Sequence, residues 1–146
     1  MLCCGNCNNE PQRTDYLPLA PDRWPLLNKF YREQRSSMRG DKTAQAWVAR
    51  EGDIVAALNL APVVGGQWLT GLLVAQDQRG RGVARALIEQ ATASVEGTVW
   101  LFCDPELAAF YQRLGFREHY DLPQSLAERL VRYQRNKALI AMAKTP

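Results

Sequence analysis

Apolar positions along the chain follow two spacings, one typical of strands and the other of helices. The continuous apolar run at residues 98–103 predicts a strand buried on both faces. Apolar runs at 45–50 and 54–60, on either side of the turn Glu51-Gly52-Asp53, predict a hairpin. The expected elements are strands at 15–20, 45–50, 54–60, 67–74, 98–103, 116–120 and 138–143, and helices at 22–36, 84–95, 105–114 and 122–133.

Each of the first three expected helices carries an apolar face at three- and four-residue spacing. These faces comprise Leu26, Leu27, Phe30 and Tyr31, then Ala84, Leu87, Ile88, Ala91 and Val95, and finally Leu107, Phe110, Tyr111 and Leu114. Asp104 is suited to cap the third helix, Pro105 to begin it and Gly115 to end it. The order of elements predicts an α/β fold with a mixed central sheet.

A glycine-containing basic turn joins the strand at 67–74 to the helix that follows. Unpaired backbone N–H groups and the positive end of the dipole make a helix N-terminus attractive to phosphate. Gly80 and Gly82 leave room for a phosphate, and Arg79, Arg81 and Arg85 add positive charge. The turn matches neither the Walker nor the dinucleotide pattern. A simple strand-to-helix loop with solvated arginines is the alternative interpretation.

Two sequence blocks resemble the GNAT superfamily of acyl-CoA-dependent N-acyltransferases. Arg79-x-x-Gly82-x-Ala84 is similar to the family motif Q/R-x-x-G-x-G/A, and the block from Asp104 to Phe116 is similar to the later helix that runs N-x-x-A-x-x-F/L-Y-x-x-x-G-F. The two blocks occur in the order and at the separation found in the family. The resemblance covers residues 15–144 and implies helices flanking a mixed sheet whose central parallel strands splay apart.

The resemblance also implies a set of cofactor-binding and catalytic residues. Pantetheine would lie between the strands at 67–74 and 99–103, with the backbone N–H of Leu72 at the thioester oxygen and the backbone of Val74 beside pantetheine. The pyrophosphate would bind the turn formed by Arg79, Gly80, Arg81, Gly82, Val83 and Ala84. Tyr111 occupies the position of the general acid that protonates the departing thiolate; a core tyrosine is the alternative.

Three positions depart from the family pattern. Asp104 stands where asparagine is frequent, and we expect it at the cofactor site either as a helix cap or as a proton relay. Leu107 replaces a frequent alanine. Trp68 stands at the position of the frequent acidic base, four residues before Leu72, and an indole cannot accept the proton. Another carboxylate, His119 or a water chain is then needed, unless the pKa of the substrate amine is low enough for no base to be required.

Composition limits the protein class. A chain of 146 residues with 47% hydrophobic content predicts one domain at 15–146. Its net charge of +3 is mild and gives little support to a dedicated nucleic-acid binder. With no membrane-spanning or secretory pattern, we expect a cytoplasmic protein. Cys3, Cys4 and Cys7 fall in an expected flexible tail at 1–14; a zinc site would need Cys103 or His119 as a fourth ligand, and no metal is expected.

The leading functional interpretation is direct acetyl transfer from acetyl-CoA to a primary amine in a ternary complex, by a monomer or homodimer. The family selects its acceptor through the first helix and its loop, here 24–42, and through elements from His119 onward. Arg32, Arg35, Arg39 and Trp68 suggest an anionic or aromatic acceptor, although solvated arginines explain them equally. A non-catalytic acyl-CoA-binding module is one alternative. Acylation of aminoacyl-tRNA, with phosphates held by Arg129, Arg132, Arg135 and Lys137, is the other.

Overall fold

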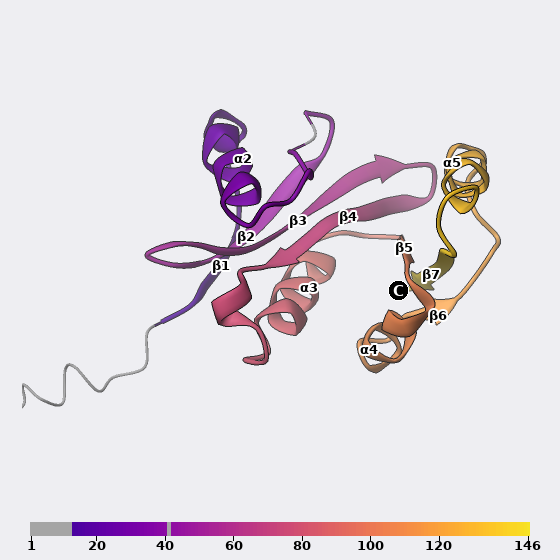
Figure 1. Cartoon of the computed structure of the whole chain (residues 1–146). Helices are drawn as coiled ribbons and strands as arrows, with labels where there is room; N and C mark the ends of the chain where they lie inside the picture. Colours follow the sequence, from indigo (N-terminus) through magenta and orange to yellow (C-terminus); the bar gives the residue numbers. More distant parts are fainter. Residues whose placement is uncertain (1–12, 41) are drawn as a thin grey trace, which may run out of the picture.

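A mixed sheet runs through the centre of the molecule (Figure 1). The computed structural model describes residues 13–40 and 42–146, and within them the sheet has seven strands in the order β1-β2-β3-β4-β5-β7-β6. The strands are β1 (Asp15–Pro18), β2 (Gln45–Glu51), β3 (Asp53–Val63), β4 (Gly66–Val74), β5 (Thr98–Cys103), β6 (Arg117–Glu118) and β7 (Ile140–Lys144). Neighbouring strands are antiparallel except β4 and β5, which are parallel. The expected mixed α/β sheet is confirmed.

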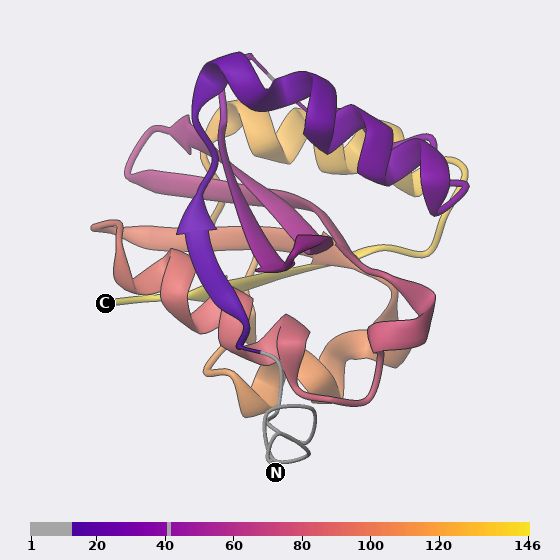
Figure 2. The same cartoon turned by 90° about the vertical axis from the view of Figure 1, so that its left-hand side faces the viewer.

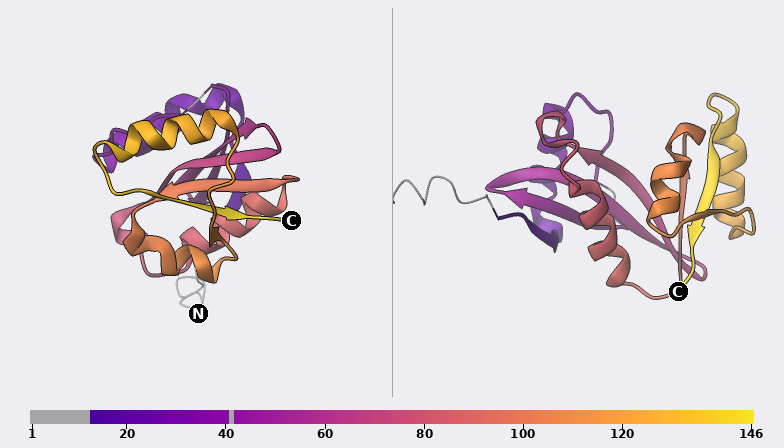
Figure 3. Two further views of the ribbon diagram at one scale, coloured as in Figure 1. Left: turned by 90° about the vertical axis from the view of Figure 1, so that its right-hand side faces the viewer. Right: turned by 90° about the horizontal axis from the view of Figure 1, so that it is seen from below.

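Helices cover both faces of this sheet. Helices α2 (Trp24–Glu33) and α5 (Gln124–Gln134) lie on one face, and α3 (Val83–Ala93) and α4 (Ala108–Arg113) lie on the other (Figures 1 and 2). Figure 1 shows α2 and α5 standing apart over this face, and Figure 3 shows α3 and α4 in front of the sheet in its right view. Short 3-10 turns precede α2, α3 and α4 at Pro21–Arg23, Gln76–Gln78 and Pro105–Leu107.

The apolar core is divided between the two faces. The largest cluster joins α3 and α4 to the sheet and includes Leu87, Ile88 and Tyr111 packed against Val99 and Leu101. On the other face, separate clusters lie under α2 and under α5. Each fully buried leucine or isoleucine contributes about 1.5–3 kcal/mol through burial. The two helical layers are therefore fixed independently on a common sheet.

Two apolar residues assigned to buried faces are exposed, and those assignments are wrong. Leu26 is 45% exposed because the buried stripe of α2 passes through Leu27, Phe30 and Tyr31, and Leu26 lies at the margin of that stripe. Leu107 is 48% exposed because it lies in the 3-10 turn before α4, whose tighter winding rotates it away from the α-helical face.

Element boundaries also differ from those expected. The strand expected at 116–120 is reduced to Arg117–Glu118, and the helix expected over 22–36 is an α-helix only over Trp24–Glu33. The first strand ends at Pro18, and the N–H of Leu19 still donates to the carbonyl oxygen of Ala46 at 2.8 Å. Within the described residues, no helix has both the length and the apolar character needed to cross a membrane.

Candidate active site

Strands β4 and β5 pair over their first residues and then separate. Their register runs from Gly66↔Thr98 to Trp68↔Trp100, and both strands continue past that last pair. Beyond it, the described chain provides no strand partner for the β5-facing edge of β4. An open strand edge carries unpaired backbone N–H and C=O groups, which an extended ligand can bind. The splayed central pair expected from the sequence is therefore present.

A β-bulge interrupts β4 within this separated region. The register between β3 and β4 shifts by one residue, so Gly71 and Leu72 together oppose Leu58. Gly71 has a φ of +66°, the left-handed conformation that this kind of bulge requires and that a side chain disfavours. The bulge redirects the backbone of β4 at the position for which an oxyanion donor was expected.

The backbone groups beyond the bulge alternate in direction. The N–H of Ala75 donates to the carbonyl oxygen of Val55 across the β3–β4 ladder, at 2.8 Å. Because neighbouring residues in an antiparallel strand direct their backbone groups to opposite sides, Val74 directs its groups away from β3. These groups therefore face the open side, where the sequence predicts pantetheine to bind.

Buried polar side chains from α2 and β3 hold the bulge. The Tyr31 hydroxyl donates to the carbonyl oxygen of Gly71 at 2.7 Å, and the Asn59 Nδ2 amide donates to the Tyr31 hydroxyl at 3.2 Å. Burial raises the pKa of Tyr31 to about 12, against the opposing effect of the bond from Asn59. Sequence reasoning placed Tyr31 only in the core and overlooked Asn59, whose signal was a single amide in an otherwise apolar strand.

The glycine turn before α3 presents an open backbone. Gly82 precedes the helix with a φ of +78°, and no side chain caps the helix at this position. A Cβ built on Gly80 or on Gly82 would meet no atom within 4 Å. The N–H groups of the first helical turn, beginning at Val83 and Ala84, are thus accessible from outside. This open cradle at the positive end of an 11-residue helix fits a pyrophosphate group.

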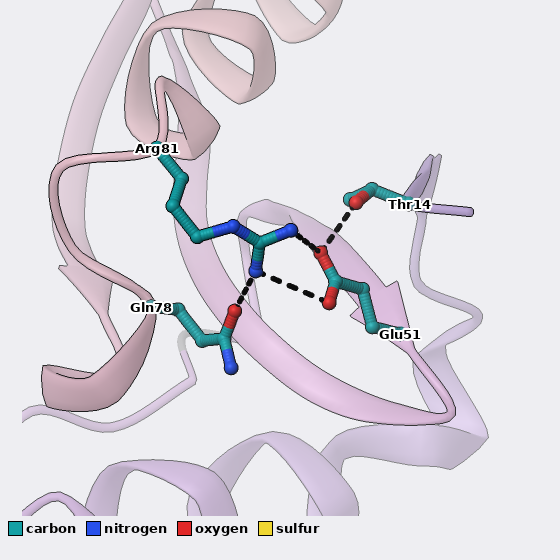
Figure 4. Close-up of polar contacts among 4 residues, drawn as sticks. All are labelled: Thr14, Glu51, Gln78 and Arg81. Carbon is teal, nitrogen blue, oxygen red and sulfur yellow. Dashed lines mark hydrogen bonds and ion pairs between the residues drawn. The ribbon is translucent and has the colours of Figure 1, made fainter. Parts of the chain in front are cut away.

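Arg81 of this turn is joined to the hairpin between β2 and β3 (Figure 4). Its guanidinium forms an ion pair with Glu51, 3.1 Å between Nη2 and Oε2, and also donates to Gln78. The Glu51 side chain is only 3% exposed. A hydrogen bond from Thr14, and then the one from Arg81, lower the pKa of Glu51. These contacts position Arg81 as a brace between the turn and the hairpin.

The other two arginines near the turn also contact the protein. The Nε of Arg79 donates to the carbonyl oxygen of Val74 at 3.2 Å and so closes the segment between β4 and α3. Arg85 pairs with Glu89 one helical turn later, at 3.4 Å. Charge near the turn therefore comes from side chains that also shape it, and the backbone N–H groups are its accessible donors.

Tyr111 lies in α4, on the face of the sheet that carries α3. It is 6% exposed, and its ring meets Phe110 and Phe116 edge to face at centroid distances of 5.1 and 5.9 Å. Burial, and secondarily the nearby Cys103, raise the pKa of Tyr111 to about 12, so the hydroxyl keeps its proton at neutral pH. Within residues 13–40 and 42–146, no hydrogen bond occupies that hydroxyl.

The end of β5 supplies two further residues of the site. Asp104 caps the turn before α4, where its Oδ1 accepts from the N–H of Glu106 at 2.9 Å, and its predicted capping role is confirmed. Cys103 is buried, and its Sγ lies 3.7 Å from the Sδ of Met142. Burial first, and the charges of Asp104 and Glu118 next, raise the pKa of the Cys103 thiol to about 11.

A cavity of about 590 Å³ opens between β4 and α5, on the face opposite Tyr111. It is lined by Arg39, Trp68, Leu69, Thr70, Gly71, Phe102, Arg132, Tyr133, Asn136, Lys137 and Leu139. Its wall includes the bulge residue Gly71, so the cavity reaches β4 immediately before Leu72. An acceptor bound there would approach the splayed strands from the side opposite α3 and α4.

The cavity gathers only some of the residues expected to contact an acceptor. Arg39, Trp68, Arg132 and Lys137 line it, and Arg129 lies over the Trp68 ring at 5.1 Å. Arg32 lines a separate hollow on α2. Arg35 and Arg135 line neither this hollow nor the cavity beside β4. His119 follows the edge strand β6 and is not in the cavity wall. Among the described lining residues there is no carboxylate or imidazole to act as a base.

Within the part of the chain that the structure describes, no metal site is formed by histidine, cysteine, aspartate or glutamate. No three of these side chains lie close enough together to hold a metal ion there. Cys3, Cys4 and Cys7, together with most of the expected tail, lie outside the described residues.

Comparisons of the sequence and the fold with known proteins identify the family of this chain. Residues 42–118, more than half of the chain, match the family model described as an acetyltransferase (GNAT) domain. No curated protein sequence matches significantly. The fold resembles a GNAT-family acetyltransferase from Staphylococcus aureus, with a TM-score of 0.65 and 15% identity over 91% of this chain and 99% of that one.

Two other solved structures have the same fold. The ribosomal-protein-S18-alanine N-acetyltransferase from Escherichia coli gives a TM-score of 0.66 and 18% identity over 91% of this chain and 94% of that one. The N-acetylglutamate synthase from Neisseria gonorrhoeae was solved in complex with coenzyme A and N-acetyl-glutamate. It gives a TM-score of 0.68 and 10% identity over 93% of this chain and 36% of that one. The family model and the shared fold agree with the splayed strands and the open glycine turn: the chain belongs to the GNAT acetyltransferase family.

Proposed function

We propose that this protein transfers an acetyl group from acetyl-CoA directly to a primary amine, with both substrates bound at once. The observation that carries the proposal is the separation of β4 from β5 beyond Trp68, next to the open glycine turn of α3. The solved N-acetylglutamate synthase complex contains coenzyme A, which supports a coenzyme A site on this fold. Bound acetyl-CoA would supply the activated thioester.

The backbone would hold the co-substrate at two places. The N–H groups at Gly80, Gly82, Val83 and Ala84, with Arg79 and Arg81 shaping the turn, would bind the pyrophosphate. The Val74 N–H at the open edge of β4 would bind pantetheine as an added strand would. The turn and the strand edge are connected by the bond from Arg79 to Val74, so they form a continuous surface.

Leu72 and Tyr111 would act on the two atoms whose charge changes. The Leu72 N–H would donate to the thioester oxygen as negative charge develops there; removing such a donor costs about 2.7–4 kcal/mol of transition-state stabilisation. The amine nitrogen forms a bond to the carbonyl carbon as the C–S bond breaks. The Tyr111 hydroxyl, protonated and without a hydrogen-bond partner among the described residues, would give its proton to the leaving sulfur.

The acceptor ammonium would lose its proton to water. The described lining of the cavity offers no carboxylate or imidazole, and Trp68 stands where the family often has an acid. This feature also favours a second candidate function, a non-catalytic acyl-CoA-binding module.

One experiment separates the two functions. Acetyl-CoA binding is measured by calorimetry, and release of the free thiol of coenzyme A is followed with a panel of primary amines. Binding with amine-dependent thiol release supports the transferase. Binding with thiol release from no amine supports the binding module, and the absence of binding contradicts both.

A further inference from the structure

The cavity beside β4 has an unbalanced charge. Arg39 enters it from the segment after α2, and Arg132 and Lys137 enter from α5 and the residues that follow it. None of these cations has a carboxylate within ion-pair distance among the described residues. The described lining also contains no acidic residue. The arginines near the glycine turn differ, because Arg81 and Arg85 each pair with a glutamate.

Aromatic rings form part of the wall of the same cavity. Trp68 contacts Phe102 at a centroid distance of 5.6 Å, and Phe102 contacts Tyr133 edge to face at 6.4 Å. Thr70 and Gly71 continue the wall to the bulge. The cavity therefore combines cations that have no carboxylate partner among the described residues with the bulge at the expected reaction centre.

We propose that the acceptor is a primary amine that also carries a carboxylate or a phosphate, bound by Arg39, Arg132 and Lys137 so that its amine reaches the bulge. This inference rests on the proposed acetyl transfer and specifies its substrate class. A guanidinium binds either anion through paired N–H donors, and an ammonium binds either as a point charge. Polyamines and other acceptors with several positive charges are repelled by the same groups.

The same charges bear on how the amine is deprotonated. The titratable or charged groups lining the cavity are Arg39, Arg132, Lys137 and Tyr133, and Arg129 lies over the Trp68 ring of its wall. A nearby positive charge disfavours a second one, so this environment lowers the pKa of an ammonium held beside the bulge. The cationic cavity thus favours loss of the ammonium proton, which a carboxylate base promotes where the family has an acidic residue at the position of Trp68.

The test compares acceptors matched in skeleton and differing in charge. Thiol release from acetyl-CoA is measured with O-phosphoethanolamine, β-alanine, ethanolamine, propylamine and spermidine. In parallel, calorimetry in saturating coenzyme A measures binding of O-phosphoethanolamine and ethanolamine. We expect kcat/KM for the anionic members to exceed that of their neutral-tailed partners by about 10- to 100-fold, the usual effect of a hydrogen-bonded charge. The preference for O-phosphoethanolamine over ethanolamine measures selection for a phosphate, and the preference for β-alanine over propylamine measures selection for a carboxylate.

Charge-removing variants assign the effect to the cavity. Arg132→Gln and Lys137→Gln should reduce kcat/KM for O-phosphoethanolamine by about 10-fold or more and reduce that for ethanolamine clearly less, because ethanolamine loses no anion contact. Arg132→Gln should also move the pH dependence of kcat to higher pH, because kcat reports the pKa of the bound ammonium. Arg50→Gln removes an equal charge from an exposed site on β2 and should do neither.

The outcomes separate this inference from the proposed function. Turnover without preference for anionic amines, or with preference for spermidine, would overturn the inference and leave acetyl transfer standing. If no amine is acetylated, acetyl transfer fails, and the binding arm decides the inference: Arg132-dependent binding of O-phosphoethanolamine supports an anion site, and its absence rules that site out.

Discussion

The hydroxyl of Tyr31 on α2 donates a 2.7 Å hydrogen bond to the carbonyl oxygen of Gly71 in β4, a residue 40 positions later in the chain. This bond joins the helix that precedes the basic Arg39 segment to the bulge that precedes Leu72. Asn59 donates to the same hydroxyl from the neighbouring strand, so the group that bonds the bulge is itself held by a buried amide. The geometry expected of the oxyanion donor therefore depends on α2.

Replacing Tyr31 with phenylalanine should weaken both stability and catalysis. The variant leaves the buried Asn59 amide without its acceptor, which costs about 1–3 kcal/mol of unfolding free energy. Loss of the bond to Gly71 should lower kcat while the KM for acetyl-CoA changes little, because the glycine turn is separate from the bulge. Denaturant unfolding and steady-state kinetics measure the two effects. Tyr16→Phe on β1 is the control, and an unchanged kcat in Tyr31→Phe would show that the bulge does not need this bond.

A methyl group on Gly71 should disrupt the bulge more than positive φ alone explains. Its Cβ would lie 2.8 Å from the Asn59 Nδ2 and 2.9 Å from the Tyr31 hydroxyl. Gly52→Ala is a matched control, since Gly52 has a φ of +80° and a Cβ there meets no atom within 4 Å. We expect Gly52→Ala to lose about 1–2 kcal/mol from backbone strain and Gly71→Ala to lose clearly more in the same unfolding assay. Equal losses would mean that the neighbouring polar groups move aside freely.

Local patterns predicted the elements that position the site because each pattern reports a local physical preference. The continuous apolar run at Thr98–Cys103 is a strand, and Asp104 caps the turn that follows it. The glycines before Val83 have the positive φ values that a tight turn into a helix permits. The predictions that Leu26 and Leu107 are buried were wrong because a periodicity of apolar residues does not specify where a short helix begins.

Contacts between distant segments could not be read from the sequence. The bond between Tyr31 and Gly71, and the pairing of Arg81 with Glu51, join residues 40 and 30 positions apart whose meeting depends on how the sheet is assembled. Arg132 was identified only as one member of a basic series near the C-terminus. Its place in a cavity with Arg39 follows from α5 and the segment after α2 covering the same face of the sheet, which no local pattern encodes.

A glutamate at position 82 should abolish binding of coenzyme A. The present Gly82 leaves open space at the N-terminus of α3, and a carboxylate there would repel a pyrophosphate and cover the first N–H groups. Coenzyme A should raise the Tm of the wild-type protein and leave that of Gly82→Glu unchanged. Gly52→Glu adds the same charge at a positive-φ glycine in the hairpin and should keep the coenzyme A shift in Tm. A normal coenzyme A shift in Gly82→Glu would remove this turn from the cofactor site.

Replacing Glu51 with glutamine should loosen the glycine turn in a pH-dependent way. Hydrogen bonds from Thr14 and Arg81 lower the pKa of Glu51 below its ordinary value of 4.5, so its contribution to stability is present above that pH and is lost as pH falls through the lowered pKa. The stability difference between wild type and Glu51→Gln should therefore be largest near neutral pH and shrink below about pH 4. Without the brace on Arg81, the KM for acetyl-CoA should rise. A difference that persists unchanged into acid would contradict the ionic contribution of Glu51.

Replacing Tyr111 with phenylalanine tests the proposed general acid while keeping the ring contacts with Phe110 and Phe116. Loss of a positioned acid should lower kcat by about 10²- to 10⁴-fold with little change in the affinity for acetyl-CoA. Because the described residues give the hydroxyl no hydrogen bond, its removal should change the unfolding free energy by less than about 1 kcal/mol.

The pH dependence provides a second readout for the same residue. With a pKa of about 12, Tyr111 stays protonated across the neutral and mildly alkaline range. The wild-type kcat should therefore show no decline from loss of this proton until the pH approaches that value, and any rise at lower pH reports deprotonation of the acceptor amine. Tyr133→Phe controls for a hydroxyl on the cavity side. If a folded Tyr111→Phe protein retains nearly full kcat, water protonates the leaving thiolate and Tyr111 is a core residue.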